Sequence, residues 1–329
     1  MTGDFARVRL HVVTGKGGTG KTTVAAALAL ALAREGRNVL LTEVEGRQGI
    51  SQVFDIPPLP YEERRVARVS GGGEVHALAI DPEAALIEYL QIFYNLGRAG
   101  SAMRKLGAID FATTIAPGMR DVLLTGKVKE AVSRRIDGHL VYDAVVMDAP
   151  PTGRITKFLN VTEEVQGLAR VGPIHHQAQS VMRLLRSEET AVHLVTLLEE
   201  MPVQETVDGA AELEAAGLPV GGIVVNLVRD PLLGPADLAA ALEGSLDAAE
   251  LAASLKSAGL ELPSADVDAL VRETADHAQR VALEDAQRDE LAGAERSMRA
   301  MYELPQINAA LDLTHLHRLA DLLAGQGMA

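Results

Sequence analysis

Short apolar runs alternate with longer helical stretches along most of this chain. Such runs, too short for helices and apolar on both faces, are typical of strands in a parallel sheet that helices cover on both sides. We expect strands at Val8–Val13, Val39–Thr42, Val75–Ile80, Val141–Met147, Val192–Leu198, Gly221–Leu227 and Met298–Leu304. Their alternation with helices predicts an α/β fold built with right-handed crossovers.

The segments between these runs have helical periodicity. The clearest helices are the Ala- and Leu-rich run Val24–Ala33, a helix that begins at Pro82 after the N-cap Asp81, and a closing helix at Asp312–Leu323. The stretch Pro57–Gly73 holds prolines, a charge cluster and three successive glycines, so we expect a surface connection there.

These elements predict one domain over residues 1–329. Apart from the sheet and its covering helices, the expected additions are helical insertions at about 82–140 and 155–190, and an outer helical region at about 236–290 that is broken at Pro263. The insertions have two interpretations. They form either a groove for an apolar client helix or only the outer helices that cover one face of the sheet.

A glycine-rich motif lies between the first apolar run and the Ala-rich helix. It consists of Gly15, Lys16, Gly17, Gly18, Thr19, Gly20, Lys21 and Thr22, and Thr23 follows it. Glycines let backbone N–H groups curve around an anion, and the following helix presents the positive end of its dipole to that anion. The motif therefore predicts a nucleotide triphosphate site in which Lys21 binds the β- and γ-phosphates and Thr22 binds Mg²⁺.

Lys16 stands directly after the first glycine of the loop and narrows the class of protein. The phrase Lys-Gly-Gly-Thr-Gly-Lys-Thr at 16–22 resembles the deviant Walker A motif of dimeric ATPases that include the arsenical-pump ATPase, the tail-anchored-protein targeting ATPase, the Min and Par positioning ATPases and the nitrogenase iron protein. This resemblance implies a three-layer P-loop NTPase fold with a mostly parallel sheet and an inserted α-helical subdomain, with ATP and Mg²⁺ as cofactors. It also implies that Lys16 reaches the phosphates of a second subunit; the alternative is a solvated loop charge.

Acidic residues after two expected strands fit the switches of the same family. Glu45 falls where the family usually has an aspartate that positions the attacking water, and Glu43 falls on an earlier acidic position. A glutamate reaches about 1.5 Å further than an aspartate, and a misplacement of about 1 Å can lower a rate on the order of a hundredfold. We therefore expect weak intrinsic turnover.

The phrase Asp148–Arg154 resembles the second switch of the family, except that Arg154 replaces a histidine. An acid at the carboxyl end of a buried strand is where an α/β nucleotide fold places its Mg²⁺-organising aspartate. The residues that the resemblance makes catalytic are Lys16, Glu45 and Asp148, and its metal ligands are Thr22 and Asp148.

Three further phrases resemble the arsenical and tail-anchored branch in particular, at residues 79–90, 199–206 and 304–305. Leu304 and Pro305 resemble the loop that covers the adenine in that branch. Asn226 ends an expected strand where the family uses an amide to recognise the adenine edge, although a strand-terminal asparagine is otherwise a turn former. The closest resemblance is to actinobacterial members that are often described as anion-transporting ATPases.

Composition limits the remaining function classes. The formal net charge of −14 disfavours binding to nucleic acid or to an anionic membrane, so we expect at most transient membrane association. The chain has no cysteine, which excludes disulfides, an iron–sulfur cluster, thiolate arsenite sites and a cysteine zinc clamp. There is no run of about 18 apolar residues, so we expect a cytoplasmic protein. Because the cysteine clamp is excluded, we expect no zinc.

Three functions fit these observations. The first is a dimeric ATPase switch, a homodimer or a heterodimer with a related subunit, which couples ATP binding and hydrolysis to the handling of a protein or membrane-protein client. The second is a positioning ATPase of the Min and Par kind, or a subunit that drives anion transport. The third is a small-molecule kinase or ligase that uses the same phosphate loop.

Overall fold

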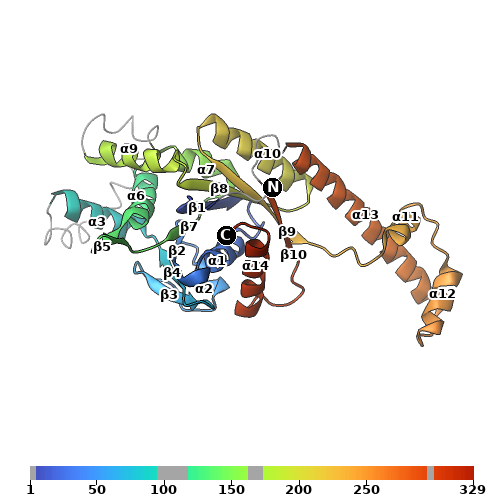
Figure 1. Ribbon diagram of the computed structural model, residues 1–329. Helices are drawn as coiled ribbons and strands as arrows, with labels where there is room; N and C mark the ends of the chain where they lie inside the picture. The colour runs from blue at the N-terminus through green and yellow to red at the C-terminus, as the bar shows by residue number, and fades with distance from the viewer. Residues whose placement is uncertain (1–4, 95–117, 162–172, 295–299) are drawn as a thin grey trace.

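The computed structural model describes residues 5–94, 118–161, 173–294 and 300–329. Its centre is an eight-stranded sheet (Figure 1) made of β1 (Leu10–Gly15), β2 (Asn38–Glu43), β3 (Arg64–Arg68), β4 (Glu74–Ala79), β7 (Ala144–Asp148), β8 (Thr190–Thr196), β9 (Val220–Val228) and β10 (Met301–Pro305). The strand order is β10-β9-β8-β1-β7-β2-β4-β3. All neighbours are parallel except β3 and β4.

The edge strand β3 corrects one expectation, because we predicted a surface connection over Pro57–Gly73. Arg64–Arg68 pairs antiparallel with β4 inside that stretch. The strand is short and carries arginines that are largely exposed, which is how edge strands avoid pairing with other chains. Its polar sequence therefore lacks the apolar signal of a buried strand. A small hairpin with strands of two residues each, β5 (Arg135–Ile136) and β6 (His139–Leu140), forms a separate sheet.

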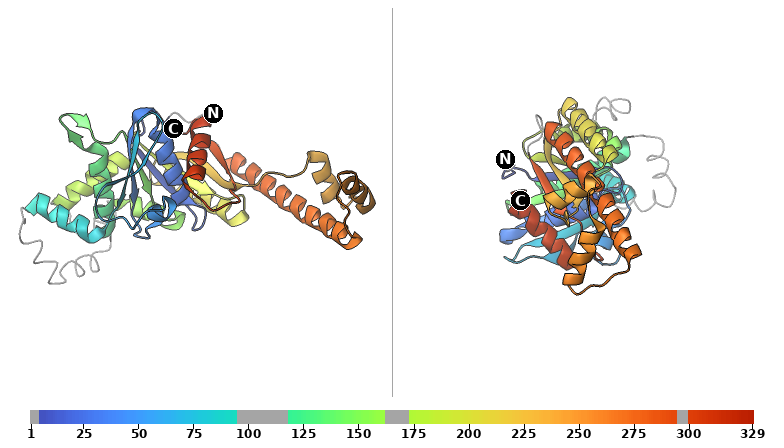
Figure 2. Two further views of the ribbon diagram at one scale, coloured as in Figure 1. Left: turned by 90° about the horizontal axis from the view of Figure 1, so that it is seen from below. Right: turned by 90° about the vertical axis from the view of Figure 1, so that its right-hand side faces the viewer.

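Helices cover both faces of the sheet and make three layers (Figures 1 and 2). One face is packed by α1 (Lys21–Leu32), α14 (Leu313–Gly325) and the short α2 (Gly49–Val53). The other is packed by α3 (Pro82–Tyr94), α6 (Met119–Ser133), α7 (Thr152–Leu159), α9 (Pro173–Leu185) and α10 (Glu200–Ala215). The predicted three-layer α/β class with a mostly parallel sheet is confirmed.

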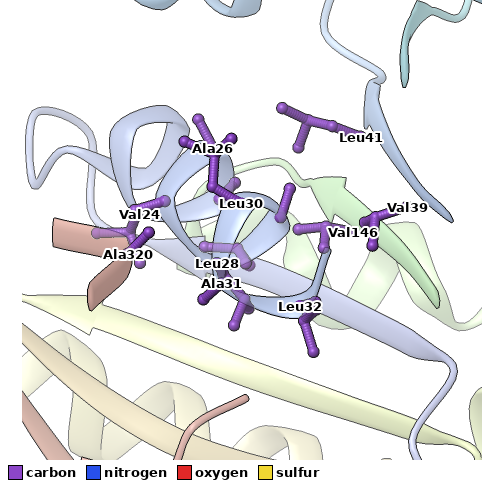
Figure 3. Close-up of a cluster of buried hydrophobic side chains, with 14 of the residues drawn as sticks. Val24, Ala26, Leu28, Leu30, Ala31, Leu32, Val39, Leu41, Val146 and Ala320 are labelled. Atoms are coloured by element: carbon purple, nitrogen blue, oxygen red, sulfur yellow. The ribbon is translucent and has the colours of Figure 1, made fainter. Parts of the chain in front are cut away.

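Helix α1 is the most deeply buried of the described helices. Every residue from Val24 to Leu32 is buried, because the helix packs on the sheet and is itself covered by α14. Its side chains meet Val39, Leu41 and Val146 of the sheet and Ala320 of α14 in one aliphatic cluster (Figure 3). A helix that is apolar all round belongs in such a site, and this burial fixes the position of the loop that precedes α1.

The outer helical region contains α11 (Pro235–Leu242), α12 (Ala248–Ser257) and α13 (Ser264–Ala294). These helices form an arm that extends away from the sheet, as Figure 2 shows. The inner end of α13 is anchored, because Leu291 is buried in a cluster with Leu198 and Val203. As expected, the helical pattern breaks at Pro263, between α12 and α13.

Some sequence-based expectations concern residues outside the described part of the chain. These are the helices expected at 95–117 and 162–172 and the start of the last strand at Met298. Within the described residues that strand begins at Met301. In the four described ranges, no helix combines the length and the apolar composition that a membrane crossing requires.

Candidate phosphate-binding site

The loop from Gly15 to Thr22 joins β1 to α1, and it needs glycine at two close approaches. A Cβ atom on Gly15 would lie 2.1 Å from the carbonyl oxygen of Val195 in β8. Gly20 has a φ of +85°, and a Cβ atom there would lie 2.4 Å from the side-chain nitrogen of Asn226 in β9. The loop is therefore packed against the carboxyl ends of β8 and β9 at the N-terminus of α1, where backbone N–H groups favour an anion.

Lys21, Thr22 and Asp148 meet at this N-terminus. The Thr22 hydroxyl donates a hydrogen bond of 2.6 Å to Oδ2 of Asp148, the last residue of the buried strand β7. Nζ of Lys21 donates to the backbone carbonyl of Lys16 at 3.3 Å. Because hydroxyl and carboxylate oxygens are the ligands that Mg²⁺ prefers, this pair fits a magnesium site beside bound phosphates.

Burial shifts the proton affinities of both charged groups in this corner. It raises the pKa of Asp148 to about 6, although the Thr22 hydrogen bond and the Lys21 charge act in the opposite direction. Burial likewise lowers the pKa of Lys21, and the nearby Asp148 opposes that shift. Both charges are thus partly desolvated, and each gains from a counter-charge such as phosphate or a metal ion.

Glu43 and Glu45 lie in one segment but have different contacts. Glu43 is buried, and its carboxylate accepts hydrogen bonds from the backbone N–H groups of Gln48 and Ile50, the latter at 3.1 Å. It thereby holds the backbone at the start of α2. The carboxylate of Glu45 lies 3.7 Å from Nη1 of Arg154 and 3.6 Å from Nε of Arg47. The two predicted switch segments are therefore joined by an ion pair.

Lys16 is paired within its own subunit. Its Nζ lies 2.8 Å from Oε1 of Glu205 in α10, while the Thr152 hydroxyl donates to Oε2 of the same carboxylate at 3.3 Å. Sequence reasoning did not assign a role to Glu205, although it lies within the phrase at 199–206 that carried part of the family resemblance. The carboxylate bridges the phosphate loop and the first residue of α7.

The residues expected near the adenine lie at the same edge of the sheet. Asn226 is buried in β9, and its Nδ2 donates to the carbonyl of Thr19 at 2.9 Å, so it supports the phosphate loop directly. Leu304 and Pro305 lie in strand β10 rather than in a loop. The Leu304 side chain is fully buried in the core beneath α14, which leaves Pro305 as the more accessible of the two.

Helix α6 connects the switch residues to an apolar pocket. Its first two turns, with Arg120, Asp121 and Leu124, line a cavity of about 190 Å³ together with Glu45 and Arg154. Further along, the same helix lines a second, mostly apolar cavity of about 370 Å³ that α3 and α9 complete. A displacement of α6 would change both cavities at once.

The fold and the phosphate loop define a P-loop nucleotide-binding protein, and comparison with known proteins identifies its family. The model of the anion-transporting ATPase family matches residues 8–187. The chain belongs to this family, and it is an ATPase.

Its relatives agree with this assignment. ATPase BagA of Mycobacterium tuberculosis is 55% identical over 323 residues, which cover 98% of this chain and 94% of the relative. An ATPase GET3 of Chaetomium globosum is 31% identical over 178 residues, or 53% of this chain and 49% of the relative. An arsenical pump-driving ATPase of Acidiphilium multivorum is 28% identical over 232 residues, or 65% of this chain and 38% of the relative.

Proposed function

We propose that this ATPase is a dimeric switch that couples its nucleotide state to the handling of an apolar protein or membrane-protein client. The observation that carries the proposal is the double role of α6. One end of the helix borders Glu45 and Arg154, and its middle lines the apolar cavity. A rearrangement of the switch segments on binding or hydrolysis would therefore move a wall of the cavity.

ATP and Mg²⁺ fit the residues at the phosphate site. The glycine-rich loop with Lys21 would hold the phosphates, and Thr22 and Asp148 would hold the metal, as their hydrogen bond at a desolvated position supports. When bound, Mg²⁺ supplies positive charge that offsets charge on the phosphate oxygens. Glu45 is the residue best placed in the first switch to orient water, and Arg154 and Arg47 restrain its carboxylate.

The apolar cavity is the site that we assign to the client. Its lining includes Ala85 and Tyr89 of α3 and Leu123 and Gly126 of α6, and the charged side chain of Lys127 lines it too. A lining that is mostly apolar but carries charge suits the apolar face of a helix whose ends are polar. The resemblance to ATPases that target tail-anchored proteins favours the same class of client.

The test uses a fluorescent, mostly apolar helical peptide of about 20 residues and measures its Kd by anisotropy, with and without a non-hydrolysable ATP analogue. Ser180 lines the cavity from α9, so Ser180→Trp should fill it and weaken binding at least tenfold. Arg183→Trp places the same side chain at an exposed position of the same helix, so it should leave peptide binding unchanged.

Two results would count against this function. One is a peptide affinity that does not respond to the ATP analogue in the wild type, because the cavity would then be uncoupled from the switches. The other is equal binding by the Ser180→Trp and Arg183→Trp variants, because the peptide would then bind elsewhere.

A further inference from the structure

The ammonium group of Lys16 is held by a carboxylate outside the phosphate loop. Nζ lies 2.8 Å from Oε1 of Glu205, and the two side chains are 27% and 39% exposed. The pair is thus partly shielded from water, which strengthens it relative to a fully exposed ion pair. Lys21, the other lysine of the loop, donates instead to a carbonyl of the loop itself.

A single ammonium group cannot form close ion pairs with Glu205 and with a nucleotide phosphate without bringing two anions together. Phosphate groups carry several negative charges, so a phosphate near Lys16 repels the Glu205 carboxylate and competes with it for the cation. Binding of a phosphate by Lys16, in its own or in another subunit, therefore weakens the pair with Glu205 and favours its opening.

Opening the pair also affects the second switch. The second carboxylate oxygen of Glu205, Oε2, accepts a hydrogen bond of 3.3 Å from the hydroxyl of Thr152, the first residue of α7. Thr152 follows Asp148 and the two prolines of the switch, and its side chain is buried. Glu205 therefore touches the phosphate loop and the start of the switch helix at the same time.

We propose that Glu205 is a positioning residue that keeps Lys16 away from phosphate in the nucleotide-free subunit and releases it when nucleotide binds. The release makes Lys16 available for the dimeric, ATP-bound state, so this inference rests on the dimeric switch proposed above. Because Glu205 contacts Thr152 too, the same event loosens one contact between α7 and α10. A partly exposed ion pair of this kind shifts an equilibrium by about fivefold.

The wild-type protein permits a direct test. A carbodiimide joins a carboxylate to an amine only when the two are in contact, so it should link Lys16 to Glu205 in the nucleotide-free protein, as read by peptide mass spectrometry. We expect a non-hydrolysable ATP analogue to reduce this cross-link at least fivefold. Lys256 and Glu261 lie 2.7 Å apart on the arm, and their cross-link should not change.

Absence of the Lys16–Glu205 cross-link, or a yield that nucleotide leaves unchanged relative to the Lys256–Glu261 cross-link, would overturn the inference. This measurement needs no dimer. It therefore tests the positioning role even if the proposed dimer proves wrong.

A pair of variants tests the consequence for association. Glu205→Gln removes the charge that restrains Lys16, so it should tighten ATP-dependent dimerisation about fivefold. Glu212→Gln is the matched control, because Glu212 makes a similar contact between α10 and α7, with Thr156 at 3.4 Å, but does not contact Lys16. A purely structural role for Glu205 predicts weaker or unchanged dimerisation, which would refute the proposal. Absence of any ATP-dependent wild-type dimer would instead refute the dimeric function.

Discussion

Glu45 and Arg154 occupy two positions where this chain departs from the switch motifs that it resembles, and the structure brings them within 3.7 Å of each other. The longer carboxylate of a glutamate can reach the arginine of the neighbouring switch. Arg47 approaches the same carboxylate from its other side, at 3.6 Å. The two departures thus form one local arrangement, in which the charge that would orient water is already engaged by arginines.

This arrangement predicts slow steady-state ATP hydrolysis by the purified chain. In Glu45→Asp the shorter side chain retracts from Arg154 toward the position that the resembled motif uses, so we expect kcat to rise on the order of tenfold. The measurement is phosphate release at saturating ATP. Glu62→Asp makes the same substitution at an exposed position outside both switches and should leave kcat unchanged.

Rapid hydrolysis by the wild type, with the aspartate variant no faster, would remove the reason to regard the first switch as weakened. The ion pair with Arg154 would then have to be compatible with an efficient catalytic position of Glu45.

The sequence predicted the loop, the two lysines and the acid at the end of β7 because each lies in a local motif with a recognisable context. It did not reveal Glu205. The phrase at 199–206 contains three glutamates, and only the packing of α10 beside α7 decides which of them faces Lys16. Contacts between residues so far apart in the chain have no local signal.

At the scale of elements, buried strands were predicted well and polar ones were not. The central strands β1, β7 and β8 are buried along their whole length, so their apolar runs stand out. The edge strand β3 is mostly exposed, and its residues match a loop as well as a strand. The short α2 depends on the carboxylate of Glu43, a contact that the sequence pattern does not display.

The pairing of β1 with β8 contains two buried histidines whose local geometry fixes their protons. His11 and His193 are fully buried, with Nδ1 of His11 3.0 Å from Nε2 of His193. The backbone N–H of Gly222 donates to Nδ1 of His193 at 3.1 Å, so the proton of His193 lies on Nε2 and is donated to His11. Both rings are therefore neutral in the folded protein.

This pair predicts that stability falls in mild acid. Burial lowers the pKa of His11 from 6.5 to about 4 and that of His193 well below its usual value. Below pH 6.5 the unfolded chain binds protons that the folded protein excludes, so stability is full above that pH and is lost as the pH falls toward 4. For His11 alone the loss is about 3 kcal/mol.

Urea unfolding between pH 7.5 and pH 4 measures this loss. His11→Gln removes one titrating ring and should flatten the decline relative to the wild type. His139→Gln, at an exposed position in the β6 hairpin, should leave the decline unchanged. If both variants follow the wild-type curve, the acid sensitivity has another source.

At the scale of the whole molecule, a compact three-layer body carries the nucleotide site and an extended arm carries little buried surface. Helix α12 has no buried residue, and α11 has one. The family model ends at residue 187, so the arm lies outside the region it matches. The arm is attached beside β9 and β10, while Lys16 follows β1 and the two switches begin at the ends of β2 and β7. An interface formed around Lys16 would therefore use the body.

Nucleotide binding and association at that interface should depend on different lysines of the loop. Lys21→Ala should abolish the stabilisation by ATP, which for the wild type approaches about 2.7 kcal/mol at about 100 times Kd.

Lys16→Ala should leave ATP affinity within a few fold and weaken ATP-dependent association measured by analytical ultracentrifugation, because the Lys16 charge stabilises phosphate only when a second subunit docks. Two identical chains are the simplest partners, since closed two-fold homodimers are the commonest assemblies. If the wild type stays monomeric with ATP until a related ATPase subunit is added, the assembly is a heterodimer. If the Lys16→Ala variant and the wild type associate equally, Lys16 does not act across an interface.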